Sequence, residues 1–204
     1  MPNYKYREDY AEIIQYKLAE IIEVGVLKMN LSINEFTDAF ASSRVADAFE
    51  MMDPVFILGK SSNELIGIIL DLPPVDIYVA DFASPEYWVG WVLGYAQTYF
   101  KKSFKTLLKV FPANELLEHY FPYHEMDIRH IIDVYKDRFK RYNPLKEYRK
   151  ATRLSQDDLS LLTDIPARTI RAYEQGKLDL SKAQADTVLI LAKTLGCSYE
   201  DLIY

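Results

Sequence analysis

Cysteine is almost absent from this sequence, which has a single one, Cys197, in 204 residues. That excludes an intrachain disulfide and a multi-cysteine metal site, and it is typical of a reducing compartment. The seven glycines and nine prolines are too few for a collagen-like or low-complexity chain. Long apolar runs are also missing, because the longest, residues 87–100, is shorter than the roughly 18 residues that span a bilayer. The N-terminal residues resemble no targeting signal, so we expect a cytoplasmic protein that makes no contact with membranes.

Positive charge is scarce as well. The chain has 24 Lys and Arg against 30 Asp and Glu, a net charge of −6, which excludes a nucleic-acid binder that works by bulk positive charge but not one with a local contact patch. Residues 1–142 have 15 basic and 21 acidic residues, whereas residues 143–204 have nine of each. This contrast predicts an acidic, aromatic-rich domain over 1–142 and a second domain over 143–204.

Nearly every segment has the pattern of a helix, so the sequence predicts an all-α fold. Apolar residues recur with a period close to 3.6 over residues 6–27. Ser32 with Glu35, and Ser61 with Glu64, have capping-box spacing, and Ser84-Pro85 is a further helix start. Residues 75–79 have some strand character, although an extended connector fits them equally well.

An aromatic stripe is predicted on one face of the helix that follows Ser84. Its members are Tyr87, Trp88, Trp91, Tyr95 and Tyr99. We interpret the stripe as part of the core, with an aromatic ligand pocket as the alternative. Gly90 and Gly94 lie four residues apart, so they would let a neighbouring helix approach closely.

Catalytic and metal-binding signatures are missing from the sequence. His119, His124 and His130 are separated by five and six residues, whereas two ligands on one helical face need a spacing of three or four. The sequence contains no nucleophile motif, no Gly-rich phosphate loop and no paired-carboxylate signature. We therefore expect a protein that is not an enzyme and that has no metal ion and no cofactor.

The C-terminal residues divide into five short helical blocks, 145–152, 155–163, 166–175, 182–195 and 199–203. The second and third blocks are joined by a very tight turn at Asp164-Ile165. Apolar residues on both blocks should hold them together, namely Leu159, Leu162, Ile165, Ile170 and Tyr173. A helix–turn–helix pair within a small bundle is the geometry that places a second helix in the DNA major groove.

The run LSQDDLSLLTDIPARTIRAYEQGKLDL, followed by VLILAKTLGCSYEDLI, resembles the Xre, or phage-repressor-like, helix-turn-helix family. The resemblance covers residues 143–204 and implies a five-helix, lambda-repressor-like DNA-binding domain. Two positions depart from the family pattern. Asp164 stands where many members have glycine, and Asp tolerates the left-handed backbone better than most other residues. Pro166 replaces the usual Ser or Thr, which removes a capping hydroxyl and one possible phosphate contact.

The resemblance also implies roles for single residues. Gln156 would anchor a phosphate through its side-chain amide and the N–H groups of the helix end. The third helix would be the recognition helix, with Arg168 and Arg171 donating to guanine. Five further residues complete the set. Ala167 and Ala172 would contact thymine methyl groups, Lys177 would contact a phosphate, and Arg149 and Glu174 would form a structural ion pair.

These observations favour a transcriptional regulator that binds double-stranded DNA as a homodimer, with residues 1–142 supplying oligomerisation, partner binding or effector binding. The alternative is an antitoxin or adaptor whose acidic N-terminal domain binds a protein partner and whose DNA binding serves autoregulation. An N-terminal enzyme fused to a DNA-binding module is a third possibility that no catalytic motif supports.

Overall fold

The computed structural model describes residues 5–73 and 84–203, with side chains described from Tyr10 onward. These residues form helices and no strand, which confirms the all-α prediction. The strand or connector expected at residues 75–79 lies outside the described residues. The chain divides into two compact units, Met1–Lys136 and Asp137–Tyr204, which we call the N-terminal and C-terminal units. The division falls within α10, before the boundary expected at 142/143.

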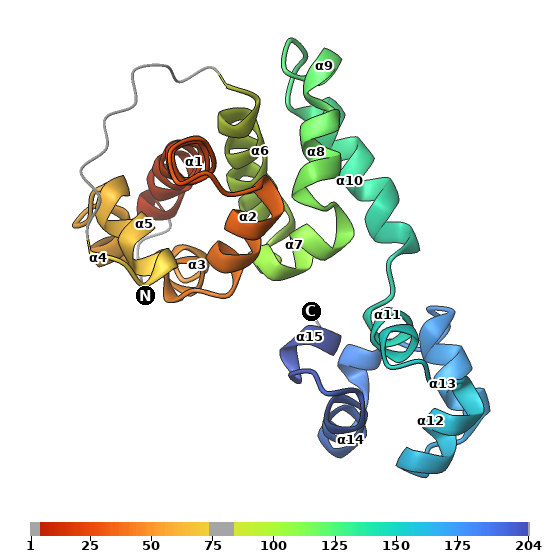
Figure 1. Ribbon diagram of the computed structural model, residues 1–204. Helices are drawn as coiled ribbons and strands as arrows, with labels where there is room; N and C mark the ends of the chain where they lie inside the picture. The colour runs from red at the N-terminus through yellow and green to blue at the C-terminus, as the bar shows by residue number, and fades with distance from the viewer. Residues whose placement is uncertain (1–4, 74–83, 204) are drawn as a thin grey trace. The chain divides into compact units, whose positions relative to one another are not determined.

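The N-terminal unit is built around two long helices, α1 (Lys5–Leu27) and α6 (Pro85–Phe100), which pack against each other (Figure 1). Shorter helices surround this pair: α2 (Ile33–Ala41), α3 (Arg44–Glu50), α4 (Pro54–Ile57), α5 (Ser62–Leu70), α7 (Phe104–Val110), α8 (Ala113–Glu118), α9 (Tyr120–Tyr123) and α10 (Arg129–Arg141). None of the described helices is both long and apolar enough to cross a membrane.

Local hydrogen bonds at the helix starts explain why many of these helices begin where they do. Both expected capping boxes are confirmed, because Ser32 and Ser61 cap α2 and α5 with the carboxylates of Glu35 and Glu64. Ser84 caps α6 by accepting a hydrogen bond from the backbone N–H of Tyr87 at 3.0 Å. Each cap satisfies backbone donors that have no partner inside the helix.

The close approach of α1 and α6 depends on two glycines, as the sequence predicts. A Cβ at Gly90 would lie 2.5 Å from the Cα of Ala19, and one at Gly94 would lie 2.7 Å from the Cα of Gln15. Neither position has room for a side chain, because the nearest atoms belong to the backbone of α1.

The core interpretation of the aromatic stripe is wrong. Four of its members are half-buried and Tyr99 is 48% exposed. The buried face of α6 instead consists of Val89, Gly90, Val92, Leu93, Gly94, Ala96 and Gln97. The reason is steric, since a helix pair in backbone contact at two glycines leaves space for small and aliphatic side chains only. The large aromatic rings therefore lie outside this backbone contact, at the edge of the helix pair, where Trp91 meets Tyr16 of α1.

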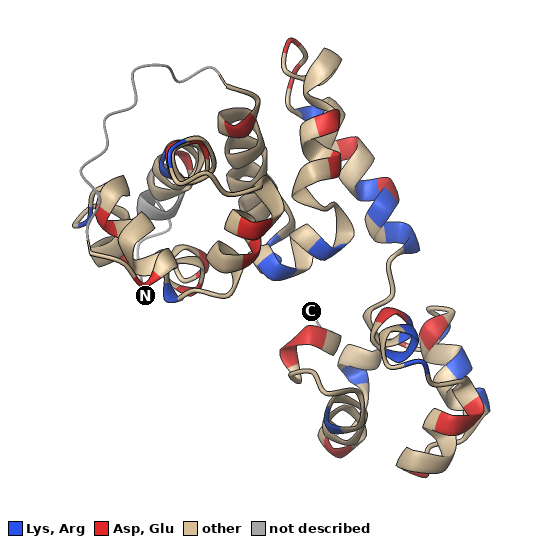
Figure 2. Ribbon diagram, in the orientation of Figure 1, with Lys and Arg blue, Asp and Glu red and all other residues tan. Residues whose placement is uncertain are grey.

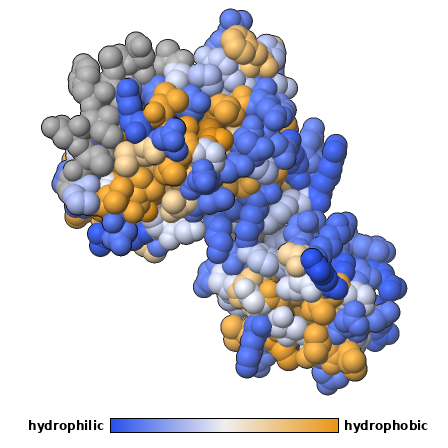
Figure 3. Space-filling view, in the orientation of Figure 1, coloured by the Kyte–Doolittle hydropathy of each residue, from blue (hydrophilic) through white to orange (hydrophobic). Residues whose placement is uncertain are grey.

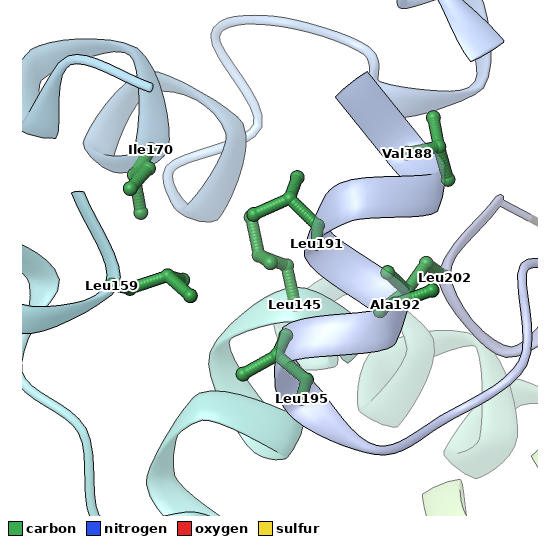
Figure 4. Packing of buried hydrophobic residues seen from close by; sticks show 8 residues of the cluster. All are labelled: Leu145, Leu159, Ile170, Val188, Leu191, Ala192, Leu195 and Leu202. Carbon is green, nitrogen blue, oxygen red and sulfur yellow. The ribbon is translucent and has the colours of Figure 1, made fainter. Parts of the chain in front are cut away.

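The C-terminal unit contains the expected five helices. They are α11 (Pro144–Ala151), α12 (Gln156–Thr163), α13 (Ala167–Glu174), α14 (Ala185–Leu195) and α15 (Glu200–Ile203), with a short 3₁₀ turn, η1 (Leu180–Lys182), before α14. Side chains from all five helices meet in one core (Figure 4), made of Leu145, Leu159, Ile170, Val188, Leu191, Ala192, Leu195 and Leu202. Cys197 is half-buried and packs against this core.

Candidate nucleic-acid interface

A tight turn joins α12 to α13. Asp164 ends α12 in the left-handed conformation, with φ 57° and ψ 19°, which confirms that an aspartate can stand at this glycine-favoured position. Pro166 precedes α13 and makes no side-chain cap, as expected for a residue without a hydroxyl group. The turn holds the two helices at a fixed crossing.

The two helices are held together by fewer apolar side chains than the sequence suggests. Leu159 and Ile170 are fully buried, and Ile165 and Tyr173 pack against the same core. Leu162 does not take part, because its side chain is 57% exposed. The expectation for Leu162 is therefore wrong. α12 also packs against α14, and the core that these helices bury includes Leu159 but not Leu162.

Arg149 on α11 and Glu174 at the end of α13 form a two-pronged ion pair. The Nε of Arg149 donates to Oε1 of Glu174 at 2.6 Å, and its Nη2 donates to Oε2 at 2.9 Å. The two side chains are 12% and 4% exposed. Burial acts to raise the pKa of Glu174, but hydrogen bonds from Arg149 and Gln156 outweigh it, so the pKa lies below its usual range. Arg149 also donates to the backbone carbonyl of Leu154 at 2.7 Å, which ties α11 to the start of α12.

Gln156, at the first position of α12, extends this ion pair toward the surface. Its Nε2 donates to Oε2 of Glu174 at 2.8 Å, and its Oε1 accepts from the Nε of Arg171 at 3.2 Å. We call these four residues, Arg149, Glu174, Gln156 and Arg171, the buttress. The sequence predicted the ion pair but missed both bonds of Gln156, because no local pattern relates positions 156 and 171.

The outer face of α13 presents two of the predicted contact residues. Arg168 and Arg171 are both exposed and lie three residues apart, on one side of the helix. Ala167 and Ala172 are half-buried beside them, and Lys177 is exposed just beyond the helix. Figure 2 shows basic residues on α13 and α11 and acidic residues along α12. The basic residues of α11 and α13 are therefore a local feature of a chain whose net charge is negative.

Apolar side chains are exposed elsewhere on this unit (Figure 3). Leu161 is 87% exposed on α12, and Leu189 is 52% exposed on α14. They are not part of the buried core, so they remain available for contacts with another molecule.

The histidines of the N-terminal unit occupy ordinary positions. The Nδ1 atoms of His119 and His124 lie 2.7 and 2.9 Å from the backbone carbonyls of Glu115 and Tyr120. Over the described residues, no three His, Cys, Asp or Glu side chains gather as metal ligands would.

Comparison with known proteins locates a family domain in the C-terminal unit. Residues 145–202 match the family model described as helix-turn-helix. Neither the curated proteins nor the solved structures contain a match to the chain. The matched range begins in α11 and ends in α15, so it spans the turn, the buttress and the whole core described above. Residues 145–202 are therefore a helix-turn-helix domain of the Xre, or lambda-repressor-like, type.

Proposed function

We propose that the protein is a sequence-specific, DNA-binding transcriptional regulator that places α13 in the major groove. The observation that carries this proposal is the pair Arg168 and Arg171, exposed on α13 within a helix-turn-helix domain. Arginine donates two parallel hydrogen bonds to O6 and N7 of guanine, and each such pair discriminates against the wrong base by about 1–3 kcal/mol. Ala167 and Ala172 lie close enough to the same face to contact thymine methyl groups.

The contacts that position the domain on DNA would come from its edges. Lys177, directly after α13, is placed to reach a phosphate. Gln156 is the second residue that we propose contacts a phosphate, both with the backbone N–H at the start of α12 and with its side-chain amide. Its Nε2 carries two hydrogens, and the bond to Glu174 uses only one of them.

The domain would work as a homodimer. One module of this size covers about 600–1,000 Å² of protein surface on DNA, which is small for tight binding. Two copies that bind half-sites one helical turn apart would double the contacts and give a palindromic operator. The exposed Leu161 and Leu189 offer apolar area for contacts between copies.

The test is selection of genomic fragments by the full-length protein at physiological salt, with the variant Arg168→Ala/Arg171→Ala beside it. We expect enrichment of a palindrome that the variant fails to enrich. The control, Arg141→Ala/Lys193→Ala, removes two exposed positive charges that lie outside α12 and α13, and it should select the same palindrome. If the folded wild-type protein enriches no sequence, or if both variants enrich the palindrome equally, the proposal is wrong.

A further inference from the structure

The N-terminal unit contains an aromatic cavity that the proposed DNA contacts do not use. Its volume is about 440 Å³, within the range of about 300–1,000 Å³ found for small-molecule sites. It lies where α6 passes α1 and α9, and its lining residues are Tyr16, Ser84, Tyr87, Trp88, Trp91, Tyr120 and His124. Three of the five residues of the aromatic stripe, Tyr87, Trp88 and Trp91, thus form a wall of this cavity.

The rings in the wall stand at steep angles to one another. Tyr16 and Trp91 meet edge to face, with centroids 4.6 Å apart and planes at 75°, and Trp88 meets Tyr120 at 5.8 Å and 82°. His124 stacks on Tyr120 at 4.1 Å. Because the rings stand perpendicular to one another, they present both faces and edges to this open hollow.

Negative charge lies beside this aromatic wall. Glu23 is 1% exposed, and its Oε1 accepts a hydrogen bond from the backbone N–H of Ser84 at 3.3 Å. Burial raises the pKa of Tyr87, and the nearby Tyr16, Glu23 and Glu20 raise it further. Glu23 and Glu20 thus act on Tyr87, a residue of the cavity wall, and negative charge near a site disfavours a bound anion and favours a cation. The amide dipoles at the start of α6 act in the opposite direction, but Glu23 and the Ser84 hydroxyl already accept hydrogen bonds there.

The same helix already holds one cation over an aromatic ring. The Nζ of Lys136 lies 5.2 Å from the centroid of the Tyr99 ring, two turns or more beyond the cavity on α6. Lys136 is also paired with Asp133 at 2.8 Å, so a carboxylate and a ring together hold this cation. The face of an aromatic ring carries partial negative charge, and tryptophan attracts cations most strongly.

We infer that this cavity binds a small organic cation with a trimethylammonium group. Such a group is compact and nearly spherical, and it cannot donate a hydrogen bond, so aromatic faces and a nearby carboxylate are the chemistry that recognises it. The site is independent of DNA binding, so it stands or falls separately from the function proposed above.

The two tryptophans of the chain are Trp88 and Trp91, so tryptophan fluorescence, excited at a wavelength that tyrosine does not absorb, reports on this cavity. The probe is choline, titrated into the full-length protein, and the control ligand is 3,3-dimethylbutan-1-ol, which has the same shape without the charge. We expect saturable fluorescence change with choline and affinity at least about tenfold weaker for the alcohol. Equal affinities would mean an apolar pocket with no preference for charge, and no saturable change with choline would mean no site; either result overturns the inference.

Two substitutions of matched exposure locate the binding. Tyr16 is 49% exposed in the cavity wall, and Tyr99 is 48% exposed on α6 outside it. Tyr16→Leu keeps an apolar side chain but removes a ring face, so choline binding should weaken about tenfold, whereas Tyr99→Leu should leave it unchanged. The circular dichroism of both variants should match the wild type, and unchanged choline binding by folded Tyr16→Leu would overturn the inference.

Trimethylammonium groups occur in free metabolites and on methylated lysine side chains, and a second titration separates these sources. A short peptide containing trimethyllysine is compared with the same peptide containing lysine. Tighter binding of the trimethyllysine peptide than of choline supports a protein source, and tighter binding of choline supports a free metabolite. Binding of the unmodified peptide as tightly as the methylated one would overturn the cation chemistry proposed here.

Discussion

Arg171 and Gln156 are joined by a hydrogen bond of 3.2 Å, from the Nε of the arginine on α13 to Oε1 of the glutamine on α12. The glutamine is itself held by Glu174, which is fixed by the buried Arg149. An exposed arginine that we propose contacts a base edge is thus connected to the interior of the domain. Such a connection reduces the number of side-chain conformations that binding would have to exclude.

We predict that Gln156 and Arg171 contribute to specific DNA binding as a coupled pair. Gln156→Ala should weaken binding even though Arg171 remains, and the double variant should lose less than the sum of the single losses. The expected coupling energy is about 0.5–1.5 kcal/mol, the range of an ordinary hydrogen bond. Fluorescence anisotropy with the selected operator measures it. The pair Gln156 and Arg168 is the control, and it should be additive to within about 0.5 kcal/mol.

Removal of the Arg149–Glu174 ion pair should destabilise α13 against local unfolding. Glu174→Gln leaves the half-buried Arg149 charge without its carboxylate, so the loss should lie between the roughly 0.2–1 kcal/mol of a surface pair and the about 3–5 kcal/mol of a fully buried one. Hydrogen exchange of the α13 amides, measured in the full chain, should show this loss of protection. The double variant Arg149→Met/Glu174→Leu should recover most of it, because two apolar side chains leave no unpaired charge. Unchanged protection in Glu174→Gln would show that the pair does not stabilise this helix.

The salt dependence of DNA binding should separate Lys177 from the arginines that we propose contact bases. A phosphate contact releases about 0.9 counterion on duplex DNA, so Lys177→Ala should reduce the slope of log K against log salt by about 1. The same variant should weaken binding to specific and unrelated DNA by similar factors. Arg168→Ala should instead reduce the ratio of specific to unrelated binding. If Lys177→Ala changes only that ratio, the assignment of this lysine to a phosphate is wrong.

The surface pair of Asp127 and Arg129 should be visible in an acid titration. Hydrogen bonds from the Arg129 side chain and backbone lower the pKa of Asp127 from 3.8 to about 2. A carboxyl whose folded pKa is depressed adds stability above its unfolded pKa, and this contribution is lost as the pH falls from about 3.8 to about 2. In a carboxyl NMR titration, Arg129→Ala should raise the Asp127 pKa toward 3.8. An unchanged pKa would mean that the side chain of Arg129 does not hold the carboxylate.

Features set by neighbours in the sequence could be predicted, and features set by distant neighbours could not. The capping boxes of Ser32 and Ser61 involve residues three positions apart, so the sequence contains all the information needed. The left-handed backbone at Asp164 is equally local. The family resemblance located the Arg149–Glu174 pair, which composition and periodicity could not have identified.

The faces of helices were harder to assign. Periodicity placed the aromatic stripe on one side of α6, but only the packing of α1 against Gly90 and Gly94 decides which side is buried. Leu162 was misassigned for the same reason, since it carries an apolar side chain on a face that no helix covers. An aromatic pocket was the alternative interpretation of the stripe, but the rest of its wall was not predictable, because Tyr16 and Tyr120 meet α6 from distant parts of the sequence.

The contact between α1 and α6 should be sensitive to single methyl groups. Gly90→Ala would place its Cβ 2.5 Å from the Cα of Ala19 and 2.7 Å from the carbonyl oxygen of Leu18. Alanine favours an isolated helix over glycine by about 1 kcal/mol, but overpacking of a tight contact costs about 1–3 kcal/mol. Because the clash is with backbone that cannot rotate away, we expect the overpacking cost to exceed the gain in helix propensity, with a net loss of up to about 2 kcal/mol. Urea unfolding followed by the fluorescence of Trp88 and Trp91 reports on this unit. Gly94→Ala, whose nearest contact is longer at 2.7 Å, should lose less, and a gain of stability in Gly90→Ala would show that the two helices can move apart without cost.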